Sequence, residues 1–343
     1  MTFKRLTNMI LSAAMGLMLA ACGSSTTEGT PSEAQTPAND SAASYKVAVV
    51  KQLDHASLDE IADAITSELD AIAKEKGITI DYGSVYSGQN DQTTLQQIGS
   101  QVIADGVQVI IPIATLAAQT MTAAASDTKT PIVYAAISDP EAAELTGIDY
   151  VTGTSDALNT EVIMDMIRAA NPDVKKIGLL YSKSEANSAK PVADAIAYLE
   201  KNGIEPVEAN GNTNDEVIQA ASYLIGQKVD AVFTPTDNVV MAAELAVAPM
   251  FAEAGIPHYT GADSFVRNGA FATCGVNYTE LGRRTARLAV QMLEGGGKGT
   301  LEDYYLMDGG IVTVNTETAS TLGLDYSAFA QFGTLSEVVT SED

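Results

Sequence analysis

Four short polar segments stand directly after expected β-strands, at matching positions in the two halves of the chain. They are residues 113–119, 137–140, 234–239 and 260–263. In open α/β sheets, ligands bind outside the carboxyl ends of the strands. A helix that begins there offers free backbone N–H groups and its positive end to a carboxylate, and a nearby acidic side chain can hold an ammonium group. The pattern therefore suits a small zwitterion.

The acidic residues available to hold the ammonium group are Asp139, Asp156, Glu185 and Asp237. Each has a second interpretation as a helix N-cap or turn former, because Ser, Thr, Asp and Asn are the usual residue types at such positions. For any single residue, the role of N-cap or turn former explains the residue type at least as well as ligand binding does. Four matched segments at one sheet edge favour a binding site.

These segments are joined by β-rich and helical stretches that alternate in the same order twice. The expected strands are 46–50, 78–85, 107–113, 131–137, 176–181, 205–208, 229–233 and 258–261. The stretches between them carry apolar residues at the three- and four-residue spacing of amphipathic helices. Segment 107–113 is continuously apolar, which indicates a strand buried on both faces. The alternation predicts an α/β protein of two Rossmann-like lobes with parallel sheets.

The composition excludes several classes of protein. The 343 residues contain 19 Lys plus Arg against 44 Asp plus Glu, a formal net charge of −25. We expect no nucleic-acid partner, because phosphates require a cationic face. We expect no metal site, since the two histidines, His55 and His258, stand far apart without a partner motif. No Gly-x-Ser-x-Gly nucleophile motif appears either, so we expect no catalytic residues, no cofactor and no enzymatic activity.

The N-terminus has the layout of an export signal. Lys4 and Arg5 precede an apolar run, 9–21, which is too short to span a hydrocarbon core of ~30 Å as a helix. Residues 1–21 are therefore expected to be a signal peptide. Residues 22–44 are rich in Ser, Thr, Pro and Ala and read as a disordered tether. The segment that ends at Cys22 resembles the bacterial lipobox, which implies cleavage before Cys22 and acylation of that residue, with palmitate among the expected groups.

Several motifs of the body resemble one receptor family. They are residues 54–59 (DHASLD), 114–119 (ATLAAQ), 138–140 (SDP), 151–156 (VTGTSD), 180–188 (LYSKSEANS) and 235–238 (PTDN). The chain from 45 to about 305 is similar to the periplasmic-binding-protein-like substrate-binding lipoproteins of ABC importers, in the branch with tryptophan- and tyrosine-type receptors. The resemblance implies the type I architecture, in which three crossovers join two lobes that close on a ligand by hinge motion.

The resemblance also implies how the chain is divided and where it works. One lobe would comprise residues 45–154 plus 275–297, and the other 155–274 plus 298–343. The expected ligand is an L-amino acid, most often aromatic. The expected partners are ABC permease subunits in the membrane, and the expected location is the extracytoplasmic side of the cell membrane, held by the lipid on Cys22.

The same resemblance assigns roles to particular residues. For the ligand carboxylate we expect Thr115 with the amides of Leu116 and Ala117, and Ser138 nearby. For the ammonium we expect Asp237, then Asp156 and Glu185. The rest of the expected site comprises Gln52, His55, Asp139, Asn187, Thr236, Asn238 and Asp263, with an apolar wall from Tyr86, Tyr134, Tyr181 or Phe265.

Two other functions fit the same pattern. One is a ligand-sensing lipoprotein that presents its closed form to a membrane signalling partner. The other is a receptor of the same fold for a sugar or a nucleoside. The absence of Trp argues mildly against a sugar, because sugar sites commonly press an aromatic face against the ring.

Overall fold

The computed structural model describes residues 43–341. The expected signal peptide, Cys22 and the tether up to residue 42 lie outside the described residues. Strand β1 (Ser44–Lys51) begins at the last residue of the expected tether. None of the helices in residues 43–341 has the length and apolar character needed to cross a membrane.

The first lobe is built on a parallel sheet in the order β12-β6-β5-β4-β1-β2, with β3 also paired to β1. Its strands are β1, β2 (Thr79–Asp81), β3 (Tyr86–Ser87), β4 (Val109–Ile113), β5 (Ile132–Tyr134), β6 (Val151–Ser155) and β12 (Tyr305–Leu306). Its helices are α1 (Ala56–Lys76), α2 (Gln92–Ala104), α3 (Thr115–Ala124) and α9 (Tyr278–Gly295).

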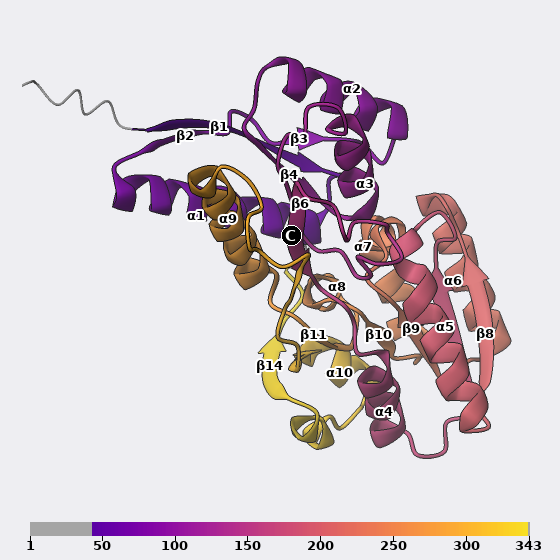
Figure 1. Cartoon of the computed structure of the whole chain (residues 1–343). Helices are drawn as coiled ribbons and strands as arrows, with labels where there is room; N and C mark the ends of the chain where they lie inside the picture. The colour runs from indigo at the N-terminus through magenta and orange to yellow at the C-terminus, as the bar shows by residue number, and fades with distance from the viewer. Residues whose placement is uncertain (1–42, 342–343) are drawn as a thin grey trace, which may run out of the picture. The chain divides into compact units, whose positions relative to one another are not determined.

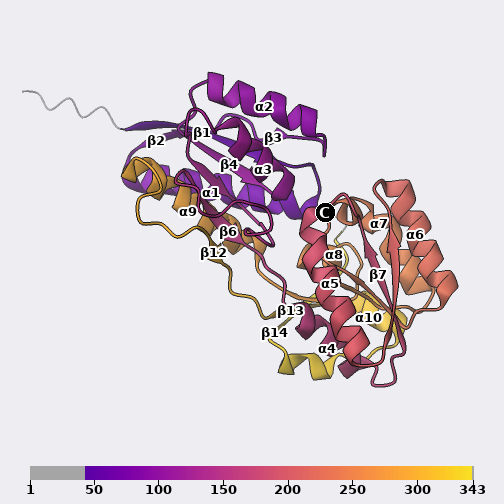
Figure 2. The ribbon, with the colours of Figure 1, turned by 45° about the vertical axis from the view of Figure 1, so that its right-hand side comes forward.

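Helices cover both faces of this sheet (Figure 2). Val47 and Val49 pack with α1 and α9, whereas Ala48 and Val50 pack with α2 and α3. Neighbouring residues of a strand point to opposite faces of the sheet. Because helices cover both faces, all four of these β1 residues are apolar. Helices α1 and α9 approach so closely that a Cβ on Gly282 would lie 2.7 Å from the Cβ of Ala64. The absence of a side chain there permits the packing.

The second lobe has a sheet in the order β14-β13-β11-β10-β9-β7-β8. Its strands are β7 (Lys176–Tyr181), β8 (Glu205–Asn210), β9 (Ala231–Thr234), β10 (His258–Thr260), β11 (Ala272–Gly275), β13 (Ile311–Asn315) and β14 (Thr334–Val338). All pairs are parallel except β11 with β13. The helices are α4 (Thr160–Ala170), α5 (Ala186–Lys201), α6 (Asn214–Gln227), α7 (Asn238–Glu253), α8 (Asp263–Arg267) and α10 (Thr316–Leu322), with a 3₁₀ turn, η1 (Ser327–Gln331).

The chain passes between the lobes three times, after β6, after β11 and after β12 (Figure 1). The expected α/β fold of two lobes with three crossovers is thereby confirmed. The expected boundary at residue 297 is wrong, because β12 still belongs to the first sheet: Tyr305 pairs with Thr154 of β6. The last crossover therefore follows β12, and β13 is the next strand of the second sheet.

The expected strand 78–85 is also shorter in the structure. Only β2 of it is a strand, because the chain bends after Asp81 at Gly83, whose φ is 58° and whose N–H donates to Asp81 Oδ1 at 3.1 Å; β3 begins beyond it, at Tyr86. A glycine adopts this left-handed backbone without the steric penalty of a side chain. The apolar pattern alone did not show this break.

Candidate ligand-binding site

A cavity of about 20 Å³ lies at the carboxyl ends of the strands, between the two lobes. First-lobe elements and the segment after β6 contribute His55, Ser57, Leu58, Ala114, Thr115, Ala136, Ser138, Asp156 and Tyr278. The second lobe contributes Asn187, Thr236, Asp237, Asn238, Met241 and Phe265. A volume of this order holds about one water molecule and no larger ligand as the lobes stand in this structure.

The structure brings eight of the expected site residues to this cavity. They are His55, Thr115, Ser138, Asp156, Asn187, Thr236, Asp237 and Asn238. The other expected residues do not line it: Gln52, Leu116, Ala117, Asp139, Glu185 and Asp263. Gln52, Leu116 and Glu185 nevertheless contact lining residues or one another through hydrogen bonds, whereas Asp139 and Asp263 have other roles.

Two lining alanines have backbone conformations that are unusual for a residue with a side chain. Ala114, between β4 and α3, has φ 74°, and Ala136, which follows β5, has φ 57°. Each is followed by polar lining residues, Thr115 and Ser138. Positive φ is costly for a non-glycine residue and persists where the surrounding structure enforces it, often at a functional site. Both conformations occur at the cavity edge of the first sheet.

Asp156 is a buried carboxylate at the cavity wall. Ser138 Oγ donates to its Oδ1 and Tyr278 OH donates to its Oδ2, each at 3.0 Å. Burial raises the pKa of Asp156, against the opposing effect of these two hydrogen bonds. Each oxygen accepts one described hydrogen bond and can accept another. Asp156 is therefore able to receive a cationic group in a place that excludes water.

Asp237 lines the cavity, but its oxygens already bind groups of the protein. Its Oδ1 accepts from Val240 N at 2.9 Å, which caps the start of α7. Its Oδ2 accepts from Ser182 N and Ser188 Oγ, both at 2.7 Å. These contacts tie α7 to the end of β7 and the start of α5. Of the two carboxylates, Asp156 accepts two hydrogen bonds from the protein and Asp237 three, so Asp156 keeps more free acceptor capacity.

A chain of hydrogen bonds beside the cavity links the two lobes. Leu116 N donates to Gln52 Oε1 at 3.0 Å, and Gln52 Nε2 donates to Glu185 Oε1 at 3.0 Å. Asn238 Nδ2 donates to Glu185 Oε2 at 2.6 Å. Burial, followed by the nearby carboxylate of Asp237, raises the pKa of Glu185 to about 7. In this arrangement the Leu116 amide, expected to bind the ligand carboxylate, binds Gln52.

The chain of hydrogen bonds continues from Asn238 to His55, the residue before α1. Asn238 Oδ1 lies 3.1 Å from His55 Nε2. Burial lowers the pKa of His55 to about 4, so the ring is neutral near pH 7. Its Nδ1 is buried and has no hydrogen-bond partner among the described residues.

Two further lining residues, both of the second lobe, contact each other: Asn187 Nδ2 donates to Thr236 O at 2.6 Å.

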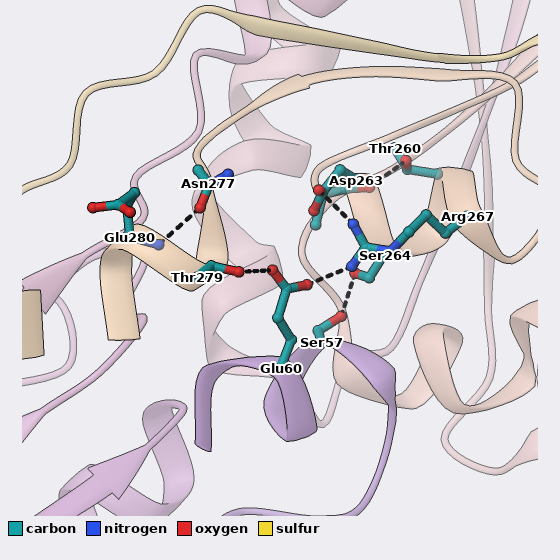
Figure 3. Close-up of polar contacts among 10 residues, drawn as sticks. Ser57, Glu60, Thr260, Asp263, Ser264, Arg267, Asn277, Thr279 and Glu280 are labelled. Carbon is teal, nitrogen blue, oxygen red and sulfur yellow. Dashed lines mark hydrogen bonds and ion pairs between the residues drawn. The ribbon is translucent and has the colours of Figure 1, made fainter. Parts of the chain in front are cut away.

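The remaining expected acids are structural. Asp139 Oδ1 accepts from Ala142 N at 3.0 Å, as a turn former does. Asp263 accepts from Arg267 at 2.6 Å, and Arg267 also binds Glu60 of the first lobe. Figure 3 shows Glu60 between Arg267 and Thr279, whose Oγ1 donates to it at 2.8 Å. We call Glu60, Asp263, Arg267 and Thr279 the lobe clasp.

Sequence reasoning missed several lining residues. They are Ser57, Leu58, Ala114, Ala136, Met241 and Tyr278. Leu58 and Met241 stand three residues after His55 and Asn238, a spacing that puts side chains on one helix face and could have indicated them. Of the four aromatic candidates, Phe265 lines the cavity and Tyr86, Tyr134 and Tyr181 do not.

The chain was compared with known proteins. Residues 46–328 match the family model described as ABC transporter substrate binding protein. A tyrosine-binding protein of Clostridioides difficile (strain R20291) is 31% identical over 329 residues, which are 94% of this chain and 93% of that protein.

Solved structures give the same result. An ABC domain in complex with L-Trp from Streptococcus pneumoniae is 28% identical with a TM-score of 0.77, and the match covers 86% of this chain and 100% of that one. A ligand-free, open substrate-binding protein with adhesive properties from Clostridium difficile is 30% identical with a TM-score of 0.63, over 87% and 100%. The chain therefore belongs to the ABC transporter substrate-binding protein family.

Proposed function

We propose that this protein is the extracytoplasmic receptor of an ABC importer and that it binds an aromatic L-amino acid between its lobes. The observation that carries the proposal is the cavity between the lobes, which holds a buried carboxylate, Asp156, and the start of α3 at Thr115. The carboxylate suits the ligand ammonium, and Thr115, the first residue of α3, suits the ligand carboxylate, since the Leu116 amide already binds Gln52. The relatives named for tyrosine and bound to L-Trp support an aromatic ligand.

The apolar residues that line the cavity would surround an aromatic side chain once the lobes rearrange around it. Leu58, Met241 and Phe265 line the cavity and belong to one continuous apolar cluster. An aromatic ring enclosed by such residues gains the free energy of removing its surface from water. The edge of the ring would then contact polar residues of the same cavity lining, such as His55 and Asn238.

Ligand capture by hinge closure is part of the proposal. Besides the lobe clasp, hydrogen bonds cross between the lobes: Gln52 to Glu185, His55 to Asn238, Ser57 to Ser264 and Ser138 to Thr236. The fold is more similar to the L-Trp-bound relative than to the ligand-free, open one. Both observations support a closed arrangement here, and opening at the three crossovers would admit the ligand.

The test is a thermal-shift screen of the purified protein against the twenty L-amino acids, with monosaccharides and nucleosides as competing classes. A ligand that binds only the folded state raises the melting temperature, by an amount that grows with its concentration above Kd. We expect stabilisation by aromatic L-amino acids. Stabilisation by sugars or nucleosides alone would contradict the proposal and leave only the receptor fold.

The lipid anchor is proposed on the sequence around Cys22 alone. In cells, the wild-type protein should fractionate with membranes and incorporate labelled palmitate. The Cys22→Ser variant should do neither while keeping its ligand binding. Membrane association that survives this substitution would contradict the anchor without affecting the proposed ligand.

A further inference from the structure

The orientation of the amide groups beside the cavity follows from a backbone donor. The N–H of Leu116 can only donate, so the atom of Gln52 that faces it is the oxygen, and the amide nitrogen of Gln52 faces Glu185. Glu185, when ionised, can only accept, so Asn238 also turns its nitrogen toward Glu185. The oxygen of Asn238 is thereby left to face His55, 3.1 Å from Nε2.

This orientation decides which nitrogen of His55 carries the hydrogen. Because the Asn238 oxygen is an acceptor, Nε2 of the neutral ring must be the donor. Nδ1 then has a lone pair and no hydrogen. It is buried without a partner among residues 43–341, and such an unsatisfied acceptor is costly unless a bound molecule supplies the donor.

The apolar lining places His55 with the side-chain end of the ligand. His55 is the N-cap of α1 and its partner Asn238 is the first residue of α7, and both line the cavity. Leu58 and Met241 both line the cavity and pack in the same apolar cluster. The ammonium partner, Asp156, is held instead by Ser138 and Tyr278. His55 has no described hydrogen bond to Asp156 and shares the cavity lining with Leu58 and Met241, so we assign its Nδ1 to the side-chain end of the ligand.

We propose that His55 offers Nδ1 to the ligand as a hydrogen-bond acceptor, and so selects aromatic amino acids whose ring carries a donor, the phenol of tyrosine or the indole N–H of tryptophan, over phenylalanine. This inference rests on the proposed function and adds a specificity-determining residue to it. A site with a buried group that requires a partner rejects a ligand lacking that partner far more strongly than it rejects a change of size.

The test is calorimetric titration with L-tyrosine, L-tryptophan and L-phenylalanine at about pH 8, where Glu185 is mostly ionised. The variant is His55→Gln, whose amide can replace Nε2 at Asn238 but offers nothing at the place of Nδ1. His55→Ala is the second variant, and His55 provides no side-chain cap to α1, so both variants should fold. Melting temperatures without ligand check this.

We expect the wild-type protein to bind tyrosine or tryptophan at least about 10-fold more tightly than phenylalanine, in line with one hydrogen bond to a buried group. In both variants this preference should fall to about 3-fold or less, and His55→Ala, which also loses the contact with Asn238 across the lobes, should in addition weaken the binding of all three ligands. A preference that survives both substitutions would overturn the inference. So would an equal loss for all three ligands in His55→Gln, which would place Nδ1 at the ammonium.

Two results distinguish a failure of the role proposed for His55 from a failure of the proposed receptor function. Binding of all three ligands by the wild-type protein without discrimination overturns the role of His55 and leaves the proposed receptor intact. Binding of no amino acid overturns the proposed function, and the specificity inference with it.

Discussion

Arg267 of the second lobe forms an ion pair with Glu60 of the first, outside the ligand cavity. The same guanidinium binds Asp263 on its own helix, and Thr279 holds the other oxygen of Glu60 (Figure 3). The charged side chains of this lobe clasp are only 19–25% exposed. Because Glu60 and Arg267 lie on different lobes, their contact joins the two lobes in the arrangement of this structure.

The first prediction concerns this ion pair. Glu60→Gln should weaken ligand affinity by about 3–10-fold, because a partly exposed ion pair contributes about 1 kcal/mol and its loss lowers the population of the closed state. The radius of gyration of the ligand-free protein, measured by small-angle scattering, should increase.

Glu280→Gln is the matched control for that variant. Glu280 pairs with Arg283 on the same helix, and both side chains are exposed, so neither affinity nor dimensions should change. If Glu60→Gln and Glu280→Gln behave alike in titration and scattering, the lobe clasp does not influence closure.

The second prediction tests the ammonium partner. Asp156→Asn should reduce the affinity for the amino-acid ligand by at least about 30-fold, since a buried ammonium would lose its charged partner. Titration calorimetry measures the change. Asp139→Asn, which alters a turn outside the cavity, should bind as the wild type does. Wild-type affinity in Asp156→Asn would remove Asp156 from the site.

The third prediction concerns Asp237, which we expect to stabilise the second lobe. Asp237→Ala removes a helix cap and leaves Ser182 N without its buried acceptor, so the free energy of unfolding should fall by about 2–4 kcal/mol. Ser188→Ala removes only one of these bonds and should cost less. Urea unfolding measures both. Unchanged stability with weakened ligand binding would instead restore Asp237 as the ammonium partner.

The fourth prediction is a pH dependence of stability. The pKa of Glu185 is about 7 in the folded protein, above the ordinary 4.5, because of burial and the Asp237 carboxylate. The folded state therefore holds this proton more tightly than the unfolded state does. The resulting stabilisation is full below about pH 4.5 and is lost as the pH rises through about 7.

Glu185→Gln cannot titrate at this position and should lack that component. We expect the free energy of unfolding of the wild type to fall relative to the variant between about pH 5 and pH 8. Urea unfolding of both proteins in half-unit pH steps gives the difference directly. Parallel curves across this interval would show that Glu185 keeps an ordinary pKa.

The alternation of apolar strands and amphipathic helices was enough to predict the two lobes, because burial on both faces of β4 and one apolar stripe on α1 follow from local spacing. The resemblance of the motifs supplied the crossovers. The position of β12 could not be predicted, since the two residues Tyr305 and Leu306 have no distinctive pattern and are placed by pairing with β6.

The chemical type of the site could also be predicted from the sequence, because polar residues that follow parallel strands meet at the carboxyl edge of the sheet. The sequence could not predict which acid at the cavity has oxygen lone pairs left to accept a further hydrogen bond. Asp156 and Asp237 are the same residue type, and only the folded chain surrounds Asp237 with three protein donors and leaves Asp156 with two. The role of Asp263 was likewise decided by Arg267 and Glu60, whose meeting depends on lobes distant in sequence. The spacing of apolar residues along the chain determines the helices and strands. How many hydrogen bonds a carboxylate accepts depends instead on all of its neighbours in the folded protein.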